Sequence, residues 1–325
     1  MVSANQLATG SLVSLVVPVY NEAAVIGVFY QRATRALAAL DGLSYEILFV
    51  DDGSRDGSYQ QLATFASENP RVRVLKLSRN FGHQIAITAG IDHARGDCVV
   101  IIDADLQDPP EVMGSMIEQW RQGFDVVYGV RSEREGESRM KLMTASAFYR
   151  LLSRLTNIHI PANVGDFRLM SRRVVDQLKL LREKDRFVRG LVSWVGFRQT
   201  GVTYARDPRH AGETKYPYRT MIKFAFDGIT SFSTVPLKLA TWTGYAAALL
   251  AVLYLLGVFV QKLLGYTVEG WATIMVAMLF MGSVQLICLG ILGEYLGRIF
   301  NEVKSRPMYI IEEHLAPGSD TSHVA

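Results

Sequence analysis

The sequence has few of the features that would place it in several large classes of protein. Its 325 residues include only two cysteines, Cys98 and Cys288, with no CxxC pair and no histidine cluster nearby. We therefore expect neither a disulfide framework nor a zinc site, and a reducing compartment fits. The net charge of +3 comes from 34 basic and 31 acidic residues spread along the chain, which gives no reason to expect nucleic acid as a partner.

Common nucleotide-binding and targeting motifs are absent as well. No GxGxxG follows the first apolar run, and no GxxxxGK[ST] is present, so a dinucleotide-binding Rossmann domain and a P-loop are both disfavoured. The first residues, MVSANQLATGS, lack the basic region and apolar run of a secretory signal. We expect the first part of the chain to stay in the cytoplasm.

Charge is missing from two long stretches near the C-terminus. No residue is charged between Lys238 and Lys262, or between Glu269 and Glu294. Each stretch exceeds the roughly 20 residues that a helix needs to cross a bilayer. Because the connection KLLGYTVE is short, we predict a hairpin of two transmembrane helices with both flanks on one side. The alternative is a pair of buried helices in a soluble core.

The flanks of this hairpin are more basic than its connection. They carry Lys238, Arg298, Lys304 and Arg306. An excess of basic residues marks the cytoplasmic side, so the large N-terminal region is expected there too. Just before the first stretch, apolar residues recur at helical spacing: Ile222, Ala225, Phe226, Ile229 and Phe232. We interpret this segment as an amphipathic helix on the membrane surface, with an ordinary core helix as the alternative.

The first 205 residues alternate short apolar runs with segments long enough for helices. The runs are LVSLVVPV, YEILFV, VRVLKL, CVVIID and FDVVYG. This pattern predicts an α/β fold with a parallel, doubly wound sheet. In such sheets ligands bind beyond the carboxyl ends of the strands, so the residues that follow each run are candidates for a site. They are Tyr20, Asn21, Glu22, Asp51, Asp52, Gly53, Ser54, Asp103, Asp105, Gln107 and Arg131.

Acids dominate this set, most densely in VVIIDADLQDPPE at residues 99–111. Neighbouring carboxylates repel, and burial raises their pKa values unless a cation compensates. Mg²⁺ and Mn²⁺ prefer oxygen ligands, and in an extended segment Asp105 and Gln107 would face the same way. Asp108 precedes two prolines and is expected to cap the next helix. His83 is expected to pack at a helix start, with contact to the bound substrate as the alternative.

Six stretches in a fixed order carry a family resemblance. They are VVPVYNE, VDDGSRDGS, NFGHQIAITAGIDHARGD, DADLQDPPE, GDFRL and GETKYPYRTM, followed by the two apolar stretches. The set resembles the polyisoprenyl-phosphate glycosyltransferases of family 2, the dolichol-phosphate mannose synthase-like enzymes. The hairpin form is similar to bacterial undecaprenyl-phosphate glucosyltransferases. The resemblance implies a GT-A (Rossmann-like) catalytic domain, a nucleotide-sugar donor, Mg²⁺ or Mn²⁺, and a lipid-phosphate acceptor.

Four parts of the chain are expected on this basis. They are a cytoplasmic GT-A domain (1–205), an active-site loop with a juxtamembrane amphipathic helix (206–234), two transmembrane helices (235–300) and a cytoplasmic C-terminal tail (301–325). The resemblance also implies the inner cell membrane as location, a homo-oligomer with a tetramer as one form, and a downstream flippase as a partner.

The resemblance assigns roles to individual residues. Donor binding is expected from Pro18, Tyr20, Glu22, Asp52 and Asp103, metal binding from Asp105 and Gln107, and catalysis from Asp166, Arg131, Arg209 and Lys215. A phosphate monoester is already largely ionised at neutral pH, so the acceptor needs positive charge rather than a strong base. Asp166 is expected to act as a base or to orient a cation, with a structural ion pair to Arg168 as the alternative.

The expected reaction is the inverting transfer of glucose from UDP-glucose to a polyprenyl phosphate, giving a β-linked lipid-phosphate sugar. A GDP-mannose-dependent mannose synthase and a non-catalytic membrane-anchored nucleotide-binding scaffold are the alternatives. A processive polysaccharide synthase is disfavoured, because such enzymes carry a QxxRW motif and this chain has no Arg-Trp pair.

Overall fold

The computed structural model describes residues 10–132, 164–184, 186–206, 233–265 and 270–316. These residues belong to two compact units. The first contains the described residues up to 206 and from 306 onward, and the second contains residues 233–265 and 270–305. Each unit is described by itself.

The first unit is built on an eight-stranded sheet with the order β7-β5-β6-β4-β1-β2-β3-β8. Its strands are β1 (Leu12–Val19), β2 (Ser44–Asp51), β3 (Val72–Leu77), β4 (Cys98–Ile101), β5 (Val126–Arg131), β6 (Val164–Ser171), β7 (Gln199–Tyr204) and β8 (Ile311–Leu315). β6 and β8 are antiparallel to their neighbours, whereas the other strands run in one direction. The predicted mostly parallel α/β sheet is confirmed, and so are its five predicted strands. β6, β7 and β8 were not predicted.

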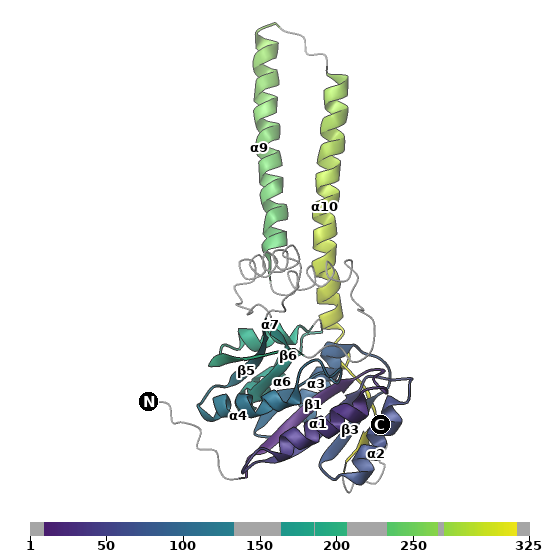
Figure 1. The fold of residues 1–325 in the computed structure, drawn as a ribbon. Helices are drawn as coiled ribbons and strands as arrows, with labels where there is room; N and C mark the ends of the chain where they lie inside the picture. The colour runs from purple at the N-terminus through teal and green to yellow at the C-terminus, as the bar shows by residue number, and fades with distance from the viewer. Residues whose placement is uncertain (1–9, 133–163, 185, 207–232, 266–269, 317–325) are drawn as a thin grey trace. The chain divides into compact units, whose positions relative to one another are not determined.

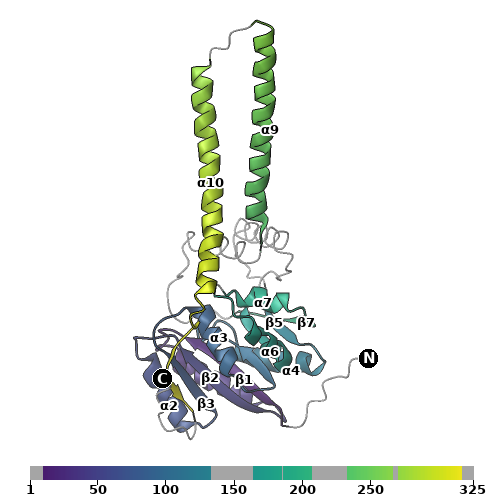
Figure 2. The same ribbon diagram turned by 180° about the vertical axis from the view of Figure 1, so that it is seen from behind.

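Helices cover both faces of this sheet (Figures 1 and 2). They are α1 (Ile26–Ala38), α2 (Ser58–Glu68), α3 (His83–His93), the 3₁₀ helix η1 (Pro110–Val112), α4 (Met113–Arg121), α6 (Arg172–Leu180) and α7 (Val188–Trp194). Alternate residues of β1 serve the two faces, as the period of a strand requires. Leu15 and the other β1 residues on its face belong to the main apolar core, together with residues of α1. Val16, on the opposite face, lies against Gly90 of α3. A Cβ on Gly90 would lie 2.2 Å from Cγ1 of Val16, so α3 packs directly on the sheet.

The segment after residue 305 is not only a tail, because it returns to the sheet as β8. β8 pairs with β3 in antiparallel register, and Lys76 contacts Glu312 at 3.1 Å. Upstream of β8, the Tyr309 hydroxyl donates to Asp92 Oδ2 at 2.9 Å. The sequence pattern predicted no strand here. Since β3 precedes the two apolar stretches and β8 follows them, the chain leaves this domain and comes back to it.

The second unit is a hairpin of two long helices, α9 (Val235–Leu263) and α10 (Trp271–Val303), which lie side by side (Figures 1 and 2). The Tyr295 hydroxyl donates to the Ser233 carbonyl at 2.6 Å, and Cys288 Sγ donates to the Ala240 carbonyl at 3.7 Å. The most apolar windows have mean hydropathies of 2.1 and 2.3, and none of their residues is buried. The predicted hairpin is confirmed. A buried soluble core does not fit helices whose apolar windows contain no buried residue, whereas association with a membrane does.

Candidate functional site

The ends of four strands bring the predicted site residues to one edge of the sheet. β1, β2, β4 and β5 are parallel in direction, so their carboxyl ends share this edge. β6 runs the opposite way, which places its first residues there as well, including Asp166. This antiparallel strand is the reason that GDFRL, distant in sequence from the other motifs, contributes to the same site.

The loop after β1 is fixed to the loop after β2 by polar contacts. Asn21 has a positive φ of 55°, its N–H donates to Ser54 Oγ at 3.0 Å, and its side-chain oxygen accepts from the Arg55 N–H at 2.8 Å. The Glu22 N–H donates to Ser58 Oγ at 2.9 Å. A left-handed non-glycine residue costs free energy that the surrounding contacts must offset, and such residues gather at functional sites. Tyr20 is 41% exposed beside this turn.

Asp51 and Asp52 are both buried but have different partners. Asp52 accepts from the N–H groups of Phe81 and Gly82 at 2.7 and 2.9 Å, so it holds the loop that leads into α3. Asp51 accepts from the Ser54 N–H at 3.3 Å through Oδ2, whereas its buried Oδ1 has no hydrogen-bond partner among the described residues. Burial raises the pKa of both groups. Donor binding by Asp52 stays a prediction, and Asp51 is a further acid with an unused oxygen.

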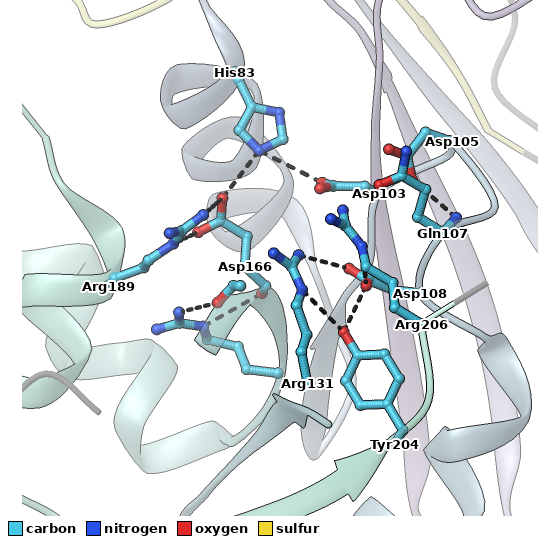
Figure 3. Close-up of polar contacts among 12 residues, drawn as sticks. His83, Asp103, Asp105, Gln107, Asp108, Arg131, Asp166, Arg189, Tyr204 and Arg206 are labelled. Atoms are coloured by element: carbon cyan, nitrogen blue, oxygen red, sulfur yellow. Dashed lines mark hydrogen bonds and ion pairs between the residues drawn. The ribbon is translucent and has the colours of Figure 1, made fainter. Parts of the chain in front are cut away.

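A turn, not an extended segment, follows β4. Leu106 has a positive φ of 61°, and the Gln107 N–H donates to Asp105 Oδ1 at 3.1 Å. The premise that Asp105 and Gln107 face the same way because the segment is extended is therefore wrong. The turn itself brings their side chains together, as Figure 3 shows.

Asp103, at the start of this turn, is a carboxylate whose charge is compensated only in part, by His83 at 3.5 Å from Oδ1. Burial, and to a smaller extent the negative charges of Asp166, Asp105 and Asp108, raise its pKa to about 6 against the opposing charge of His83. Its Oδ1 is buried and makes no hydrogen bond within the described part of the chain. No group of three or more His, Cys, Asp or Glu side chains there could hold a metal ion by itself. Mg²⁺ and Mn²⁺ sites commonly use one or two carboxylates and complete their shell with water and substrate phosphates. The oxygens of Asp105 and Gln107, beside the partly compensated charge of Asp103, fit such an ion.

Asp108 does not cap a helix. The 3₁₀ helix η1 begins at Pro110 with Pro109 in the cap position and has no side-chain cap bond. Asp108 is instead fully buried: the Tyr204 hydroxyl donates to Oδ1 at 2.5 Å, Arg131 Nη2 donates to Oδ2 at 3.3 Å, and Arg206 lies 3.4 Å from Oδ1 (Figure 3). The pattern Asp-Pro-Pro favours a cap locally, but a buried carboxylate is stabilised more by cations from two other strands.

Asp166 pairs with cations on α3 and α7. Arg189 donates to both of its oxygens, at 2.8 and 3.0 Å, and His83 Nε2 lies 3.2 Å from Oδ2 (Figure 3). Arg168, which the sequence offered as its partner, donates instead to the backbone carbonyls of Asp166 and Gly165. Burial would raise the pKa of Asp166, but Arg189 and the His83 hydrogen bond outweigh it and hold the pKa well below its usual range.

His83 links two acids of the site. Its Nε2 lies 3.5 Å from Asp103 as well as 3.2 Å from Asp166. Burial alone would lower its pKa, yet the hydrogen bond to Asp166 and the charge of Asp103 raise it to about 9, so the imidazole is a cation at neutral pH. Packing at a helix start, the expected role, describes its position but misses these contacts.

The structure thus brings together Asp103, Asp105, Gln107, Arg131 and Asp166, with Pro18, Tyr20, Glu22 and Asp52 at the neighbouring strand ends. Arg209 and Lys215 lie outside the described residues. Sequence reasoning singled out His83 without its ion pairs, and it did not identify Arg189, Tyr204 or Arg206. Nothing in their local sequence distinguishes them from ordinary surface or core residues, because their roles come from contacts across the sheet.

The fold and the site place the protein in the class that combines an α/β domain of GT-A type with a following apolar hairpin. Residues 14–179 match the family described as glycosyl transferase family 2, and residues 235–299 match the GtrB C-terminal hairpin. The chain belongs to glycosyl transferase family 2, which confirms the predicted resemblance.

Relatives are similar over almost the whole chain. Uncharacterized glycosyltransferase YkcC of Bacillus subtilis is 52% identical, covering 92% of this chain and 93% of its own. Uncharacterized glycosyltransferase sll0501 of Synechocystis is 47% identical (92% and 94%), and the bactoprenol glucosyl transferase of Shigella phage SfII is 45% identical (93% and 97%). A solved structure of glucosyl-3-phosphoglycerate synthase from Mycobacterium tuberculosis is 19% identical with a TM-score of 0.45, covering 68% of this chain and 78% of its own.

Proposed function

We propose that the protein transfers glucose from UDP-glucose to a polyprenyl phosphate with inversion, at the cytoplasmic face of the inner membrane. The observation that carries this proposal is the 45% identity to a bactoprenol glucosyl transferase over both the catalytic domain and the hairpin. The acidic edge of the sheet supports it, since a donor diphosphate brought with a divalent cation would compensate the charge of the carboxylates there.

On the donor side, Asp105 and Gln107 would hold Mg²⁺ or Mn²⁺. Such an ion supplies electrostatic stabilisation of the departing diphosphate. Pro18, Tyr20 and Glu22 line the β1 end, where the base and ribose are proposed to bind. Asp52 and Asp103 are proposed as hydrogen-bond acceptors for donor N–H or hydroxyl groups, and Asp51, with its unused buried oxygen, joins them.

On the acceptor side, positive charge is the requirement. A phosphate monoester is its own nucleophile at neutral pH, so no group has to remove a proton from it. Asp166 is ill suited to that task in any case, because its low pKa makes it a weak base. We assign it an orienting role toward Arg189 and His83. Arg131, Arg209 and Lys215 are proposed to attract the acceptor phosphate.

The hairpin is proposed to hold this site at the membrane. The basic flanks Lys238, Arg298, Lys304 and Arg306 favour the cytoplasmic side, and the return of the chain to β8 supports two crossings. The domain limits 1–205, 206–234, 235–300 and 301–325 remain proposals, with residues 207–232 outside the described part. A homo-oligomer and a flippase that consumes the product are proposed as partners.

A sugar-transfer assay tests the function. Purified full-length protein is incubated with undecaprenyl phosphate, Mg²⁺ or Mn²⁺, and radiolabelled UDP-glucose or GDP-mannose. Label in the lipid phase from UDP-glucose, lost in Asp105→Ala, is the expected result. Transfer from GDP-mannose instead would establish the mannose synthase, and no transfer from any donor would favour the scaffold.

A further inference from the structure

Arg206 is a cation of the site to which the proposed reaction assigns no role. It lies two residues after β7, and its Nε is 3.4 Å from Oδ1 of Asp108. Arg131, at the end of β5, reaches the other oxygen of the same carboxylate through Nη2 at 3.3 Å. One buried acid therefore holds two guanidinium groups that come from the ends of neighbouring parallel strands.

Asp108 alone does not balance the charge of its two arginines. Two guanidinium groups face one carboxylate, which also accepts the Tyr204 hydroxyl. Asp108 has 1% of its side chain exposed, whereas Arg131 and Arg206 keep 28% and 27% exposed. Each guanidinium carries five N–H donors, so most remain for another acceptor after the contact with Asp108. Without Asp108 between them, two neighbouring guanidinium groups would repel and separate.

The position of this pair favours one of the two phosphate-bearing substrates. The donor motifs lie at the ends of β1, β2 and β4, whereas Arg131 and Arg206 lie at the ends of β5 and β7, beyond β6 in the strand order. The pair is directed toward the part of the site where Asp103 and His83 lie (Figure 3). The absence of a side chain at Gly165 leaves room for the Arg131 guanidinium, because a Cβ there would lie 2.4 Å from Arg131 Nη2.

We propose that Arg131 and Arg206 together form a clamp for the phosphate monoester of the acceptor, and that Asp108 is the positioning residue that holds the two arginines side by side. This inference rests on the proposed function and adds Arg206 and Asp108 to it. Two guanidinium groups offer paired N–H donors to a dianion, which a single arginine cannot match.

The first experiment compares steady-state kinetics of the full-length protein with both substrates varied. Arg206→Ala is expected to raise the KM for polyprenyl phosphate about 10- to 100-fold, as loss of a charged hydrogen bond does, with the donor KM changed less than about twofold. Arg206→Lys should give an intermediate value. Arg35→Ala, which removes an exposed arginine on α1, is the matched control. An unchanged acceptor KM, or a rise confined to the donor KM, would overturn the clamp.

The second experiment separates positioning from a structural role. Asp108→Asn keeps the shape of the side chain but removes its charge, and it should raise the acceptor KM while leaving the donor KM unchanged. In the Arg206→Ala background the same change should have a smaller effect, because the pair is already broken. Equal effects in both backgrounds would show that Asp108 acts independently of Arg206 and would refute its positioning role. Thermal unfolding of each variant checks that the fold is retained.

Failure of the proposed function can be told apart from failure of the clamp. If the wild-type protein transfers no sugar, binding of farnesyl phosphate and of inorganic phosphate is measured directly on the wild type and on Arg206→Ala. Weaker binding of farnesyl phosphate by the variant supports the clamp without any turnover. Equal binding of farnesyl phosphate by the two proteins refutes it, and a loss confined to inorganic phosphate would show a free-anion site instead.

Discussion

Two acids of the same domain, the buried Glu46 and the half-buried Asp103, have opposite electrostatic surroundings. Glu46 on β2 accepts from the Ser14 hydroxyl at 2.6 Å, from Arg73 at 3.0 Å and from the Arg95 N–H at 2.8 Å. Burial would raise its pKa, but these partners lower it overall. Asp103 beyond β4 has a buried oxygen with no hydrogen-bond partner among the described residues, and its pKa is raised to about 6.

The difference separates a structural charge from one kept for a ligand. The partners of Glu46 come from β1, β3 and the loop before β4, so its charge is compensated by the fold alone. The charge at Asp103 is compensated only in part, by His83, and repelled by three other acids. A native fold retains such an unfavourable cluster where function requires it, and a cation-bearing substrate would relieve the repulsion.

Removing the Glu46 carboxylate should lower the unfolding free energy more than any other proposed substitution. Glu46→Ala leaves Arg73 buried without its carboxylate, and breaking a buried pair in this way costs about 3–5 kcal/mol of unfolding free energy. Denaturant titration of the detergent-solubilised protein measures the loss. Ser14→Ala removes one hydrogen bond to the same carboxylate and also the acceptor of the Gly96 N–H, so it should cost about 1–3 kcal/mol. A loss for Glu46→Ala no greater than that for Ser14→Ala would contradict the comparison.

Neutralising Asp103 should have the reverse effect on stability. Asp103→Asn removes repulsion from the site, so in buffer with a chelator the midpoint of unfolding should stay the same or rise. Sugar transfer should fall by about 10²- to 10³-fold, the range typical for loss of one preorganised electrostatic contact. Scintillation counting of the lipid phase and a thermal melt of the same preparation give both readings. Destabilisation with transfer intact would make Asp103 a structural acid like Glu46.

The stability contributed by β8 should depend on pH. Arg73 donates toward His314 Nε2 at 3.3 Å, so the imidazole must be neutral at that nitrogen. Burial, together with the charges of Arg73, His93 and Arg95, lowers the pKa of His314 to about 4. A lowered histidine pKa contributes stability that is complete above the unfolded value near 6.5 and is lost as the pH falls toward 4.

We expect a loss of about 1–2 kcal/mol between pH 7 and pH 4.5 from this residue, after allowance for solvent screening. Unfolding free energies of the wild type and of His314→Gln at both pH values measure it. The variant should show a loss smaller by that amount, because glutamine does not titrate. Identical pH dependence of the two proteins would remove His314 from the set of groups that hold β8.

The parallel half of the fold could be predicted because its signals are local. The runs that became β1 to β5 are dominated by apolar residues, with at most two charged residues in each, and the two apolar stretches exceed the length of a bilayer crossing. β6, β7 and β8 were missed because VGDFRLMS, QTGVTY and IEEHL mix polar and apolar residues, and their pairing with other strands is what makes them strands. A single sequence does not contain that pairing.

The candidate site, too, has a part that the local sequence predicts and a part that it does not. Asp103, Asp105 and Gln107 directly follow an apolar run, which is a position that sequence reveals. Asp108 was assigned to a helix cap because the residues next to it favour one, and its true partners, Arg131 and Tyr204, lie 23 and 96 positions away. Contacts at such separations depend on strand order, which the local pattern does not determine.

Asp56 is an exposed acid whose two oxygens both accept hydrogen bonds. It therefore separates the effect of burial on stability from the effect of hydrogen bonding. Asp56 accepts from the Ser58 N–H at 3.1 Å and from the Ala23 N–H at 3.0 Å, which joins the start of α2 to the loop after β1. Partial burial of the Asp56 carboxylate would raise its pKa, but these hydrogen bonds lower the pKa overall. Asp56→Ala should therefore cost only about 1 kcal/mol of unfolding free energy, the usual loss for a helix-start side chain. Denaturant titration against Asp41→Ala, an exposed acid on a loop, measures it. If Asp56→Ala lowers the unfolding free energy as much as Glu46→Ala does, hydrogen bonds to a carboxylate would account for its contribution to stability without any contribution from burial.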